Sequence, residues 1–270
     1  MRTSMLTLSI LALTSCSDDT GTDDSAVTEE SDTDTDTDTD TDTDTDPFGG
    51  RDEVLIFYGH GGVGPEGAWG YVTHEETIAL LEAEGLTLDH RNSWPAGVTA
   101  SRLVILPMPG FESDDTFTGG EVSDLTAVMT GGGVVAIQSD NGATVSPDVM
   151  NTLLEDLGAS MRIGGSDESF PPGGLDHPLA EGVDLLGTLA SGSVRVGDDD
   201  CLVATTGGTC QAAVRAYGAG YLVLMADSQV LEFYDDWASE GYDNAEFLWN
   251  LTRLPWALGE GPPGDDQAAR

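Results

Sequence analysis

The chain has 270 residues, of which 49 are acidic and 9 basic, for a formal net charge of −40. Neutralising nucleic-acid phosphates requires clustered Lys and Arg, and anionic lipid attracts the same cations. The charge therefore excludes ordinary nucleic-acid binding and electrostatic docking on anionic membranes. The length allows one domain of about 200 residues with appendages, and the apolar content is enough for one sizeable core.

Residues 1–15 are predicted to be a signal peptide. Arg2 supplies a positive charge, and the apolar run over 5–13 is too short to span a bilayer. The sequence Leu-Thr-Ser-Cys at 13–16 resembles the bacterial lipobox, which implies that Cys16 receives the lipid and becomes the mature N-terminus. By the same resemblance, Ser17 favours the outer membrane over inner-membrane retention. The alternative is an ordinary cleaved signal in which Cys16 has no role.

Residues 16–50 are predicted to be the lipidated cysteine and a disordered acidic linker. Thr and Asp alternate strictly from Asp32 to Asp46. Neighbouring carboxylates repel, and few apolar side chains are present to offset the entropy of ordering. A calcium loop of the EF-hand type needs Gly at its sixth position and Glu at its twelfth, where this chain has Thr37 and Thr43. A solvated spacer is therefore favoured over a calcium site.

Residues 51–257 are predicted to form one globular domain, and 258–270 a disordered tail. Apolar runs predict strands over 54–58, 86–90, 103–106, 134–137, 160–163, 185–189, 193–196, 202–205, 211–217 and 221–225. Helices are predicted from 73, over 122–129, over 146–157 and over 243–254, with Pro255 as the last helix's stop. Alternating strands and helices predict an α/β fold with a doubly wound, mostly parallel sheet and a β-rich C-terminal half.

Three segments resemble the class I glutamine amidotransferase-like superfamily, whose fold is flavodoxin-like. Gly131–Ile137 is similar to the glycine-led strand before the family's nucleophile, and Asp176–Val183 to an "HP-x-x-x-G-V" loop. Residues 218–228 and 243–251 resemble the closing strand with its acidic turn and a "DN-x-x-F-x-x-N" helix. The likeness covers residues 52–256, and it is greatest to non-catalytic branches of the superfamily in bacterial envelope proteins.

The chain departs from the family at the position of the nucleophile. An amidotransferase needs a cysteine activated by a histidine, but the turn over 138–142 reads Gln-Ser-Asp-Asn-Gly. Ser139 does not complete a G-x-S-x-G motif, because Ile137 stands where the first Gly is required. Asp227 and Ser228 occupy the place of the family's histidine. Glutamine hydrolysis is therefore excluded, and a non-enzymatic role is favoured.

His60, Asp140 and Asp227 each follow a predicted strand, so they are expected at the carboxyl edge of the sheet, where open α/β sheets bind ligands. Two interpretations remain open: the three form a ligand site, or they cap helix N-termini and loop amides. The histidines and carboxylates show no tight ligand spacing such as H-E-x-x-H, so neither a metal nor a cofactor is predicted.

The segment Gly59–Gly64 fits the dinucleotide-binding pattern G-x-G-x-x-G, with Asp89 further along the chain. In a dinucleotide site the helix begins inside the motif, whereas Pro65–Tyr71 separates this motif from the predicted helix. A loop is favoured over a dinucleotide site. Trp94, in another predicted loop, and Trp69 are candidates for a sugar-binding surface.

Cys201 and Cys210 flank a predicted hairpin with a Gly-Gly turn, and in an oxidising envelope such a pair favours a disulfide. Residues 51–270 carry 35 acidic and 8 basic side chains, a formal charge of −27. Adaptation to salt and solubility is favoured over cationic partners or loosely held Ca²⁺ as the reason for this surface.

Together these features predict a protein of the bacterial cell envelope, anchored by an N-terminal lipid. It would display a non-catalytic amidotransferase-like domain that binds an envelope protein or a small ligand. The alternative is an envelope hydrolase, acting on glycans, that uses His60 and carboxylates at the carboxyl edge of the sheet.

Overall fold

A computed structural model describes residues 51–64, 74–140, 146–165, 169–188, 192–231 and 241–257, with side chains as far as Arg253. The predicted signal peptide, linker and tail, together with Cys16 and Trp69, lie outside the described residues. Among the residues described, no helix combines the length and apolar character that crossing a membrane requires.

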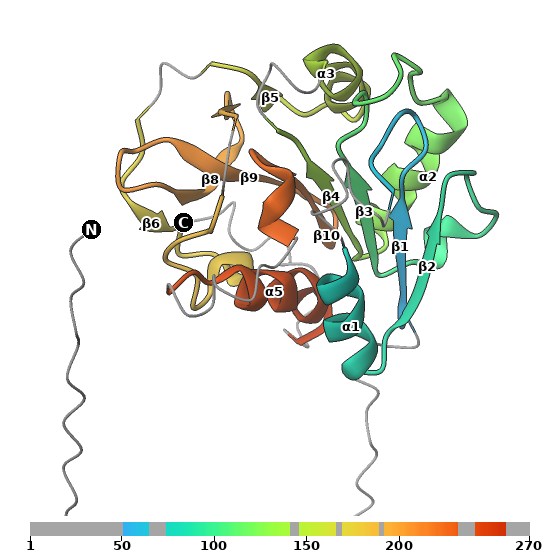
Figure 1. The fold of residues 1–270 in the computed structure, drawn as a ribbon, viewed down its shortest axis with the longest axis horizontal. Coiled ribbons are helices and arrows are strands. Elements are labelled where there is room, and N and C mark those ends of the chain that lie inside the picture. Colours follow the sequence, from blue (N-terminus) through green and yellow to red (C-terminus); the bar gives the residue numbers. More distant parts are fainter. Residues whose placement is uncertain are drawn as a thin grey trace, which may run out of the picture. The chain divides into compact units, whose positions relative to one another are not determined.

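An eight-stranded sheet in the order β2-β1-β3-β4-β10-β9-β8-β6 forms the centre of the fold (Figure 1). The strands are β1 (Glu53–Phe57), β2 (Thr87–Arg91), β3 (Leu103–Pro107), β4 (Val134–Gln138), β6 (Gly173–Gly174), β8 (Asp200–Ala204), β9 (Cys210–Tyr217) and β10 (Gly220–Met225). The first five in spatial order pair in parallel, and β9, β8 and β6 extend the sheet in antiparallel fashion. The predicted α/β class and mostly parallel sheet are confirmed.

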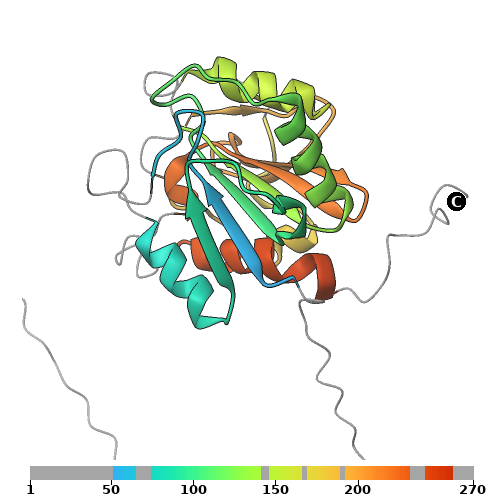
Figure 2. The ribbon, with the colours of Figure 1, turned by 90° about the vertical axis from the view of Figure 1, so that its right-hand side faces the viewer.

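Helices lie on both sides of this sheet (Figure 2). They are α1 (Glu75–Ala83), α2 (Gly119–Thr130), α3 (Pro147–Asp156) and α5 (Asn244–Ala257), with short 3-10 turns η1 (Val98–Ala100), η2 (Pro178–Ala180) and η3 (Ser228–Leu231). A separate pair of strands, β5 (Arg162–Ile163) and β7 (Val194–Arg195), is antiparallel.

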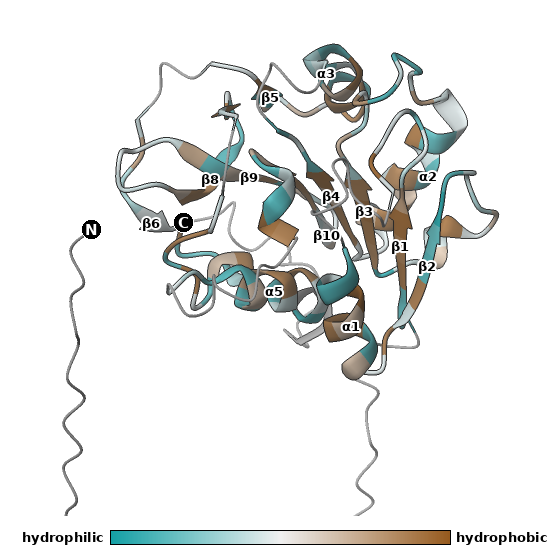
Figure 3. Ribbon diagram, in the orientation of Figure 1, coloured by the Kyte–Doolittle hydropathy of each residue, from teal (hydrophilic) through white to brown (hydrophobic). Residues whose placement is uncertain are grey.

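Each face of the sheet has its own apolar core, because successive strand side chains point to opposite faces. Leu55 and Phe57 of β1 belong to one cluster together with α2 and α3, whereas Val54 and Ile56 belong to the other together with α1 and α5. The central strands are accordingly apolar over most of their length, as Figure 3 shows, with polar residues at some ends such as Glu53 and Gln138. Continuous burial explains why unbroken apolar runs predicted these strands correctly.

Two element predictions are wrong. Residues 185–188 form no strand; instead the Leu185 amide donates to the carboxylate of Asp243 at 3.1 Å. Helix α5 continues past Pro255 to Ala257, so this proline lies inside the last turn and does not end the helix. The structure also contains β6, which the sequence did not predict because its two residues are both glycine.

Candidate functional site at the carboxyl edge of the sheet

The parallel strands end at a common edge, and the predicted site residues follow three of them. Asp140 and Asp227 come after the neighbouring strands β4 and β10, while His60 comes after β1, with β3 between β1 and β4. β1 and β4 are therefore two inter-strand spacings apart, which amounts to about 10 Å. The edge therefore places Asp140 and Asp227 side by side in the strand order, with His60 set apart.

His60 packs into a partly buried group with helix α2. Its Nε2 lies 3.1 Å from Oε1 of Glu121, and its ring centroid lies 4.3 Å from that of Phe117. Burial alone would raise the pKa of Glu121. Hydrogen bonds from Thr118 and His60 outweigh that effect and hold the pKa below its usual value. His60 therefore serves as a partner of the α2 N-terminus, which Thr118 and Glu121 close with a capping box.

The loops after β1 and β3 carry non-glycine residues in the left-handed backbone region, His60 at φ 54° and Met108 at φ 46°. The strand order changes direction between β1 and β3, which is where open α/β sheets form ligand crevices. The two loops fix each other, since the Gly110 amide donates to the His60 carbonyl at 2.9 Å and the Val63 amide to the Pro107 carbonyl at 2.9 Å. These bonds offset the cost of the unusual backbone.

The loop Gly59–Gly64 does not open a helix, since α1 begins at Glu75. The Gly62 amide donates instead to the Gly59 carbonyl at 3.1 Å, which makes a tight turn. Within Gly59–Gly64 the described backbone is not helical, so the motif itself supplies no helix N-terminus of the kind that receives a pyrophosphate in dinucleotide sites. It agrees with the interpretation of this motif as a loop.

Asp140 lines a cavity of about 370 Å³ at the carboxyl end of β4. Its side chain is buried, with 5% of the residue exposed. The other lining residues are small or apolar: Pro147, Ile163, Gly164, Gly165, Gly192 and Ser193. A Cβ at Gly192 would lie 2.8 Å from the Asp140 carbonyl oxygen, so glycine is required for this close approach. Among the described lining residues, Asp140 is thus the single acidic one, and three of the others are glycines.

Asp227 has a local structural role. Its Oδ1 accepts the amide of Gln229 at 2.8 Å, which fixes the turn into η3. The residue is 1% exposed and is not among those that line the cavity beside Asp140. For Asp227 the structure therefore matches the capping interpretation, and the three predicted residues do not share one described cavity.

Ser139, at the family's nucleophile position, is fully buried. Its hydroxyl donates to the neighbouring carbonyl of Asp140 at 3.2 Å, and its amide donates to the Met225 carbonyl at 3.0 Å. A nucleophile must present its oxygen to a substrate and lie near a base. The described contacts of Ser139 hold its hydroxyl against the backbone instead.

A buried polar network lies beside this turn, and no pattern in the sequence predicted it. His74 is fully buried, and its Nε2 donates to Oε1 of Gln138 at 3.1 Å. The amide nitrogen of Gln138 donates in turn to the Ser228 carbonyl. Burial lowers the pKa of His74 to about 4, against a smaller opposing effect of the Gln138 hydrogen bond. His74 lies just before an ordinary amphipathic helix, and no spacing links it to β4.

The polar residues of the family-like motifs connect loops to helix α5. The side-chain amide of Asn244 donates to the carbonyl oxygens of Gly187 and Val230, each at 3.1 Å. Asn250 donates to the Glu181 carbonyl at 2.8 Å. In the "HP-x-x-x-G-V" loop, Nδ1 of His177 accepts the Leu179 amide at 3.1 Å. These contacts give the motifs structural roles.

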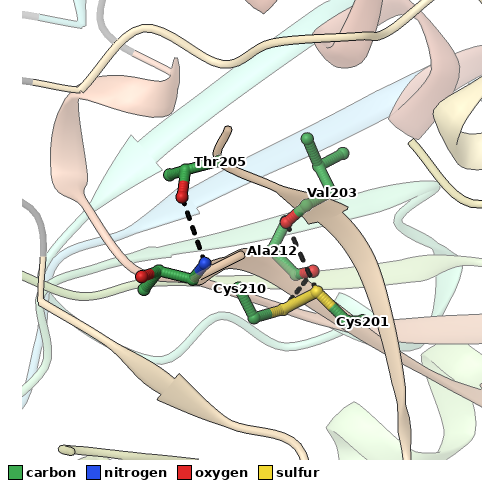
Figure 4. The surroundings of a disulfide bond; sticks show 6 residues. Cys201, Val203, Thr205, Cys210 and Ala212 are labelled. Carbon is green, nitrogen blue, oxygen red and sulfur yellow. Dashed lines mark hydrogen bonds between the residues drawn. A yellow bond between two sulfur atoms is a disulfide. The ribbon is translucent and has the colours of Figure 1, made fainter. Parts of the chain in front are cut away.

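Cys201 and Cys210 are joined by a disulfide across the β8–β9 hairpin, with their Cα atoms 5.8 Å apart (Figure 4). The sulfur of Cys210 lies 3.1 Å from the carbonyl oxygen of Ala212. Because a disulfide sulfur carries no proton, this is a contact rather than a hydrogen bond. The hairpin turn is closed by the Thr205 amide, which donates to the Thr209 carbonyl at 2.9 Å.

Trp94 lies in a loop, as predicted, but it is packed inward. Its ring meets that of Phe57 edge-on at 4.8 Å between centroids, and its indole N–H donates to Asp124 at 3.0 Å. The ring is thus partly buried against the core, which favours a packing role over sugar stacking. Among the described residues, no group of three or more His, Cys, Asp and Glu side chains is arranged to hold a metal ion.

No family model matches this sequence, and no curated protein matches it either. Solved structures do resemble the fold. The N-terminal domain of mmIFT52 superposes with a TM-score of 0.54 and 13% identity, over 74% of this chain and 97% of that domain. Cytoplasmic protein STM3548 from Salmonella typhimurium superposes with a TM-score of 0.46 and 13% identity, over 74% of this chain and 96% of that one. The cold-adapted β-galactosidase from Rahnella sp. R3 gives 0.44 and 18%, over 73% of this chain and 30% of that one. At these identities the likeness extends to the α/β fold alone.

Proposed function

We propose that this protein is a lipid-anchored component of the bacterial cell envelope, held at the outer membrane through Cys16. It displays a doubly wound, amidotransferase-like domain that has no catalytic role and binds a small ligand. The layers of helices on both faces of the sheet support the doubly wound arrangement. Two observations support the family likeness. Residues 131–137 lead into strand β4, which ends at Gln138, next to the position of the family's nucleophile. Asn250 of the 243–251 segment donates to the Glu181 carbonyl of the 176–183 segment.

The cavity beside Asp140 is the observation that carries the binding function. It opens at the carboxyl end of a parallel strand, which is the usual ligand position in this class of fold. Its volume of about 370 Å³ falls at the lower end of the range for small-molecule pockets. A buried carboxylate in a wall of glycine backbone favours a compact ligand with a positive charge or several hydrogen-bond donors.

The alternative hydrolase requires His60 and the carboxylates to act on one substrate. His60 is engaged by Glu121 and packs against Phe117, whereas Asp227 holds the η3 turn. A general base must lie within hydrogen-bond reach of the reacting group. These separate engagements favour binding over hydrolysis.

Ligand binding is tested by thermal melting in the presence of small probes. A bound ligand raises the melting temperature by mass action, so glucosamine and 1,4-diaminobutane at millimolar concentration should raise it, whereas glucose and succinate should raise it less. Gly165→Trp should abolish the rise, because Gly165 lines the cavity and a Cβ there meets none of the described atoms within 4 Å, which leaves room for a bulky side chain at the cavity wall. Gly165→Ala is the matched control. An equal rise in the Trp variant, or no rise with any probe, would refute the binding proposal.

Anchoring is tested separately. Cys16→Ser should move the full chain from the membrane fraction to the soluble fraction and abolish incorporation of a labelled fatty acid. Retention of the variant in membranes would contradict the lipid anchor without bearing on the cavity.

A further inference from the structure

A second cavity lies at the opposite end of the sheet from β2, where β8 and β6 form its antiparallel edge. Its volume is about 310 Å³. It is lined by Phe170, Pro171, Pro172, Gly173, Gly174, Leu175, Asp176, Asp199, Asp200, Cys201 and Ala204. None of these residues lines the cavity beside Asp140, so the two are separate features.

This cavity, here termed the groove, has a largely apolar lining. The two residues of β6 are glycines and Ala204 is small, so no large side chain covers the sheet here. Phe170, Pro171 and Leu175 supply larger apolar side chains to the lining. Leu175 is the one large apolar side chain that the described residues leave exposed, at 43%. An exposed apolar side chain beside a groove marks a place where an apolar group of a partner can be buried.

The charged residues that line the groove are all acidic. Asp199 is occupied, because its carboxylate binds Arg215 at 2.8 Å and accepts the amides of Ser160 and Met161 at 2.7 Å each. This leaves Asp176 and Asp200 as exposed carboxylates of the lining. Arg215 is neutralised by Asp199, so its charge does not offset them.

We propose that this groove docks an extended basic segment of a partner protein, in which an apolar side chain is flanked by Arg or Lys. The apolar side chain enters beside Leu175 and Phe170, and the flanking cations lie against Asp176 and Asp200. The size of the cavity suits one or two side chains, so an unfolded segment fits it better than a folded surface. The groove is independent of the small-ligand cavity, and either can exist without the other.

Labelled pentapeptides test this proposal on the detergent-solubilised full chain. Arg-Leu-Arg-Leu-Arg should bind more tightly than Arg-Ser-Arg-Ser-Arg, and Glu-Leu-Glu-Leu-Glu should not bind. The double variant Asp176→Asn/Asp200→Asn should weaken binding of the first peptide by about tenfold, equivalent to about 1.4 kcal/mol. In Leu175→Asn, the leucine peptide Arg-Leu-Arg-Leu-Arg should no longer bind more tightly than the serine peptide Arg-Ser-Arg-Ser-Arg. All three positions are exposed, and unchanged melting temperatures would verify that the variants fold.

The matched control is Glu155→Gln/Asp156→Asn, which removes two exposed carboxylates from α3 and so alters the net charge equally. It should change peptide affinity by less than twofold. Equal losses in the two double variants would mean that the peptide responds to overall charge, which would overturn the proposal. Equal affinity for the leucine and serine peptides would overturn it as well. Gly165→Trp should leave peptide binding unchanged, which separates this groove from the proposed small-ligand site.

Discussion

The imidazole Nε2 of His74 donates to Oε1 of Gln138 at 3.1 Å inside the protein, and this bond connects the start of α1 to the end of β4. The amide group of Gln138 is fixed in orientation, because its nitrogen donates to the Ser228 carbonyl. Its oxygen can then only accept, so Nε2 of His74 carries the proton of the neutral ring. Three segments far apart in the sequence are thereby held together by one amide side chain.

The depressed pKa of His74, about 4 against 6.5 in the unfolded chain, predicts a pH-dependent stability. Between these values the unfolded state binds the proton and the folded state does not, so stability falls as the pH is lowered from about 6.5 to about 4. The loss should amount to about 3 kcal/mol at most. Urea unfolding across this range should show the slope in the wild type and a smaller one in His74→Gln.

An unchanged slope in the His74→Gln variant would mean that another titrating group causes the pH dependence of stability. His177 is the natural comparison, because burial lowers its pKa as well, against an opposing effect of Asp200. His177→Gln should therefore flatten the same region of the curve by a smaller amount.

Helix α2 should depend on its N-terminal cap. The Thr118 hydroxyl accepts the Glu121 amide at 3.3 Å, and the Glu121 carboxylate accepts the Thr118 amide at 2.6 Å. Thr118→Ala should cost about 1 kcal/mol of unfolding free energy, whereas Thr118→Ser should retain most of it. Thr116→Ala, at an exposed position nearby, is the control and should have little effect on the melting temperature.

Substitution of Asn244 should lower the free energy of unfolding more than substitution of most other polar residues. It is 2% exposed, accepts the Gly187 amide at 2.7 Å and donates to the carbonyl oxygens of Gly187 and Val230. Asn244→Ala leaves buried backbone groups without partners, which should cost about 3 kcal/mol in chemical unfolding. A loss below about 1 kcal/mol would show that water replaces these bonds.

The disulfide should make a measurable contribution to stability. Mass analysis without reductant should find Cys201 joined to Cys210. Because the bridge closes a short loop, with nine positions separating the cysteines, reduction should cost about 2–3 kcal/mol. Cys201→Ser/Cys210→Ser should melt at the temperature of the reduced wild type and should not respond to reductant. Two free thiols in freshly isolated protein would contradict the pairing.

The acidic surface predicts a response to salt. Residues 51–270 carry a formal charge of −27, and the Debye length falls from about 30 Å at 0.01 M to about 3 Å at 1 M salt. The melting temperature should therefore rise substantially from dilute buffer to molar NaCl. Millimolar Ca²⁺ should add little beyond its ionic strength. A large rise with Ca²⁺ alone would indicate a cation site, and a flat salt series would mean that the carboxylates are too dispersed to repel.

The central part of the fold could be predicted from the sequence because its strands are buried on both faces. Val54–Phe57 and Leu103–Leu106 are apolar at every position and fully buried or nearly so, so local composition and tertiary environment agree. The region over 185–188 misled the prediction, because its apolar residues pack as a loop whose backbone is bound by Asp243 and Asn244. Such long-range polar contacts leave no periodic signal.

The candidate site was less predictable than the fold. Strand ends correctly placed Asp140 and Asp227 at neighbouring positions of one edge, because the carboxyl ends of parallel strands meet. The engagement of His60 by Glu121, 61 residues later, depends on how α2 packs. The cavity beside Asp140 is lined by Gly165, Gly192 and other small residues, and small side chains give no indication of a cavity in a sequence.

The pairing of β4 with β10 has a consequence for how the chain reaches its folded state. Val134 lies opposite Tyr221 in this central parallel pair, so β4 has no partner on one side until the chain beyond residue 220 is available. Until then β4 is an apolar edge strand, and such edges recruit other chains. Strand pairing over such distances is also slow. A chain cut before β10 should therefore aggregate, and the complete chain should depend on protection from aggregation until its last strand is inserted.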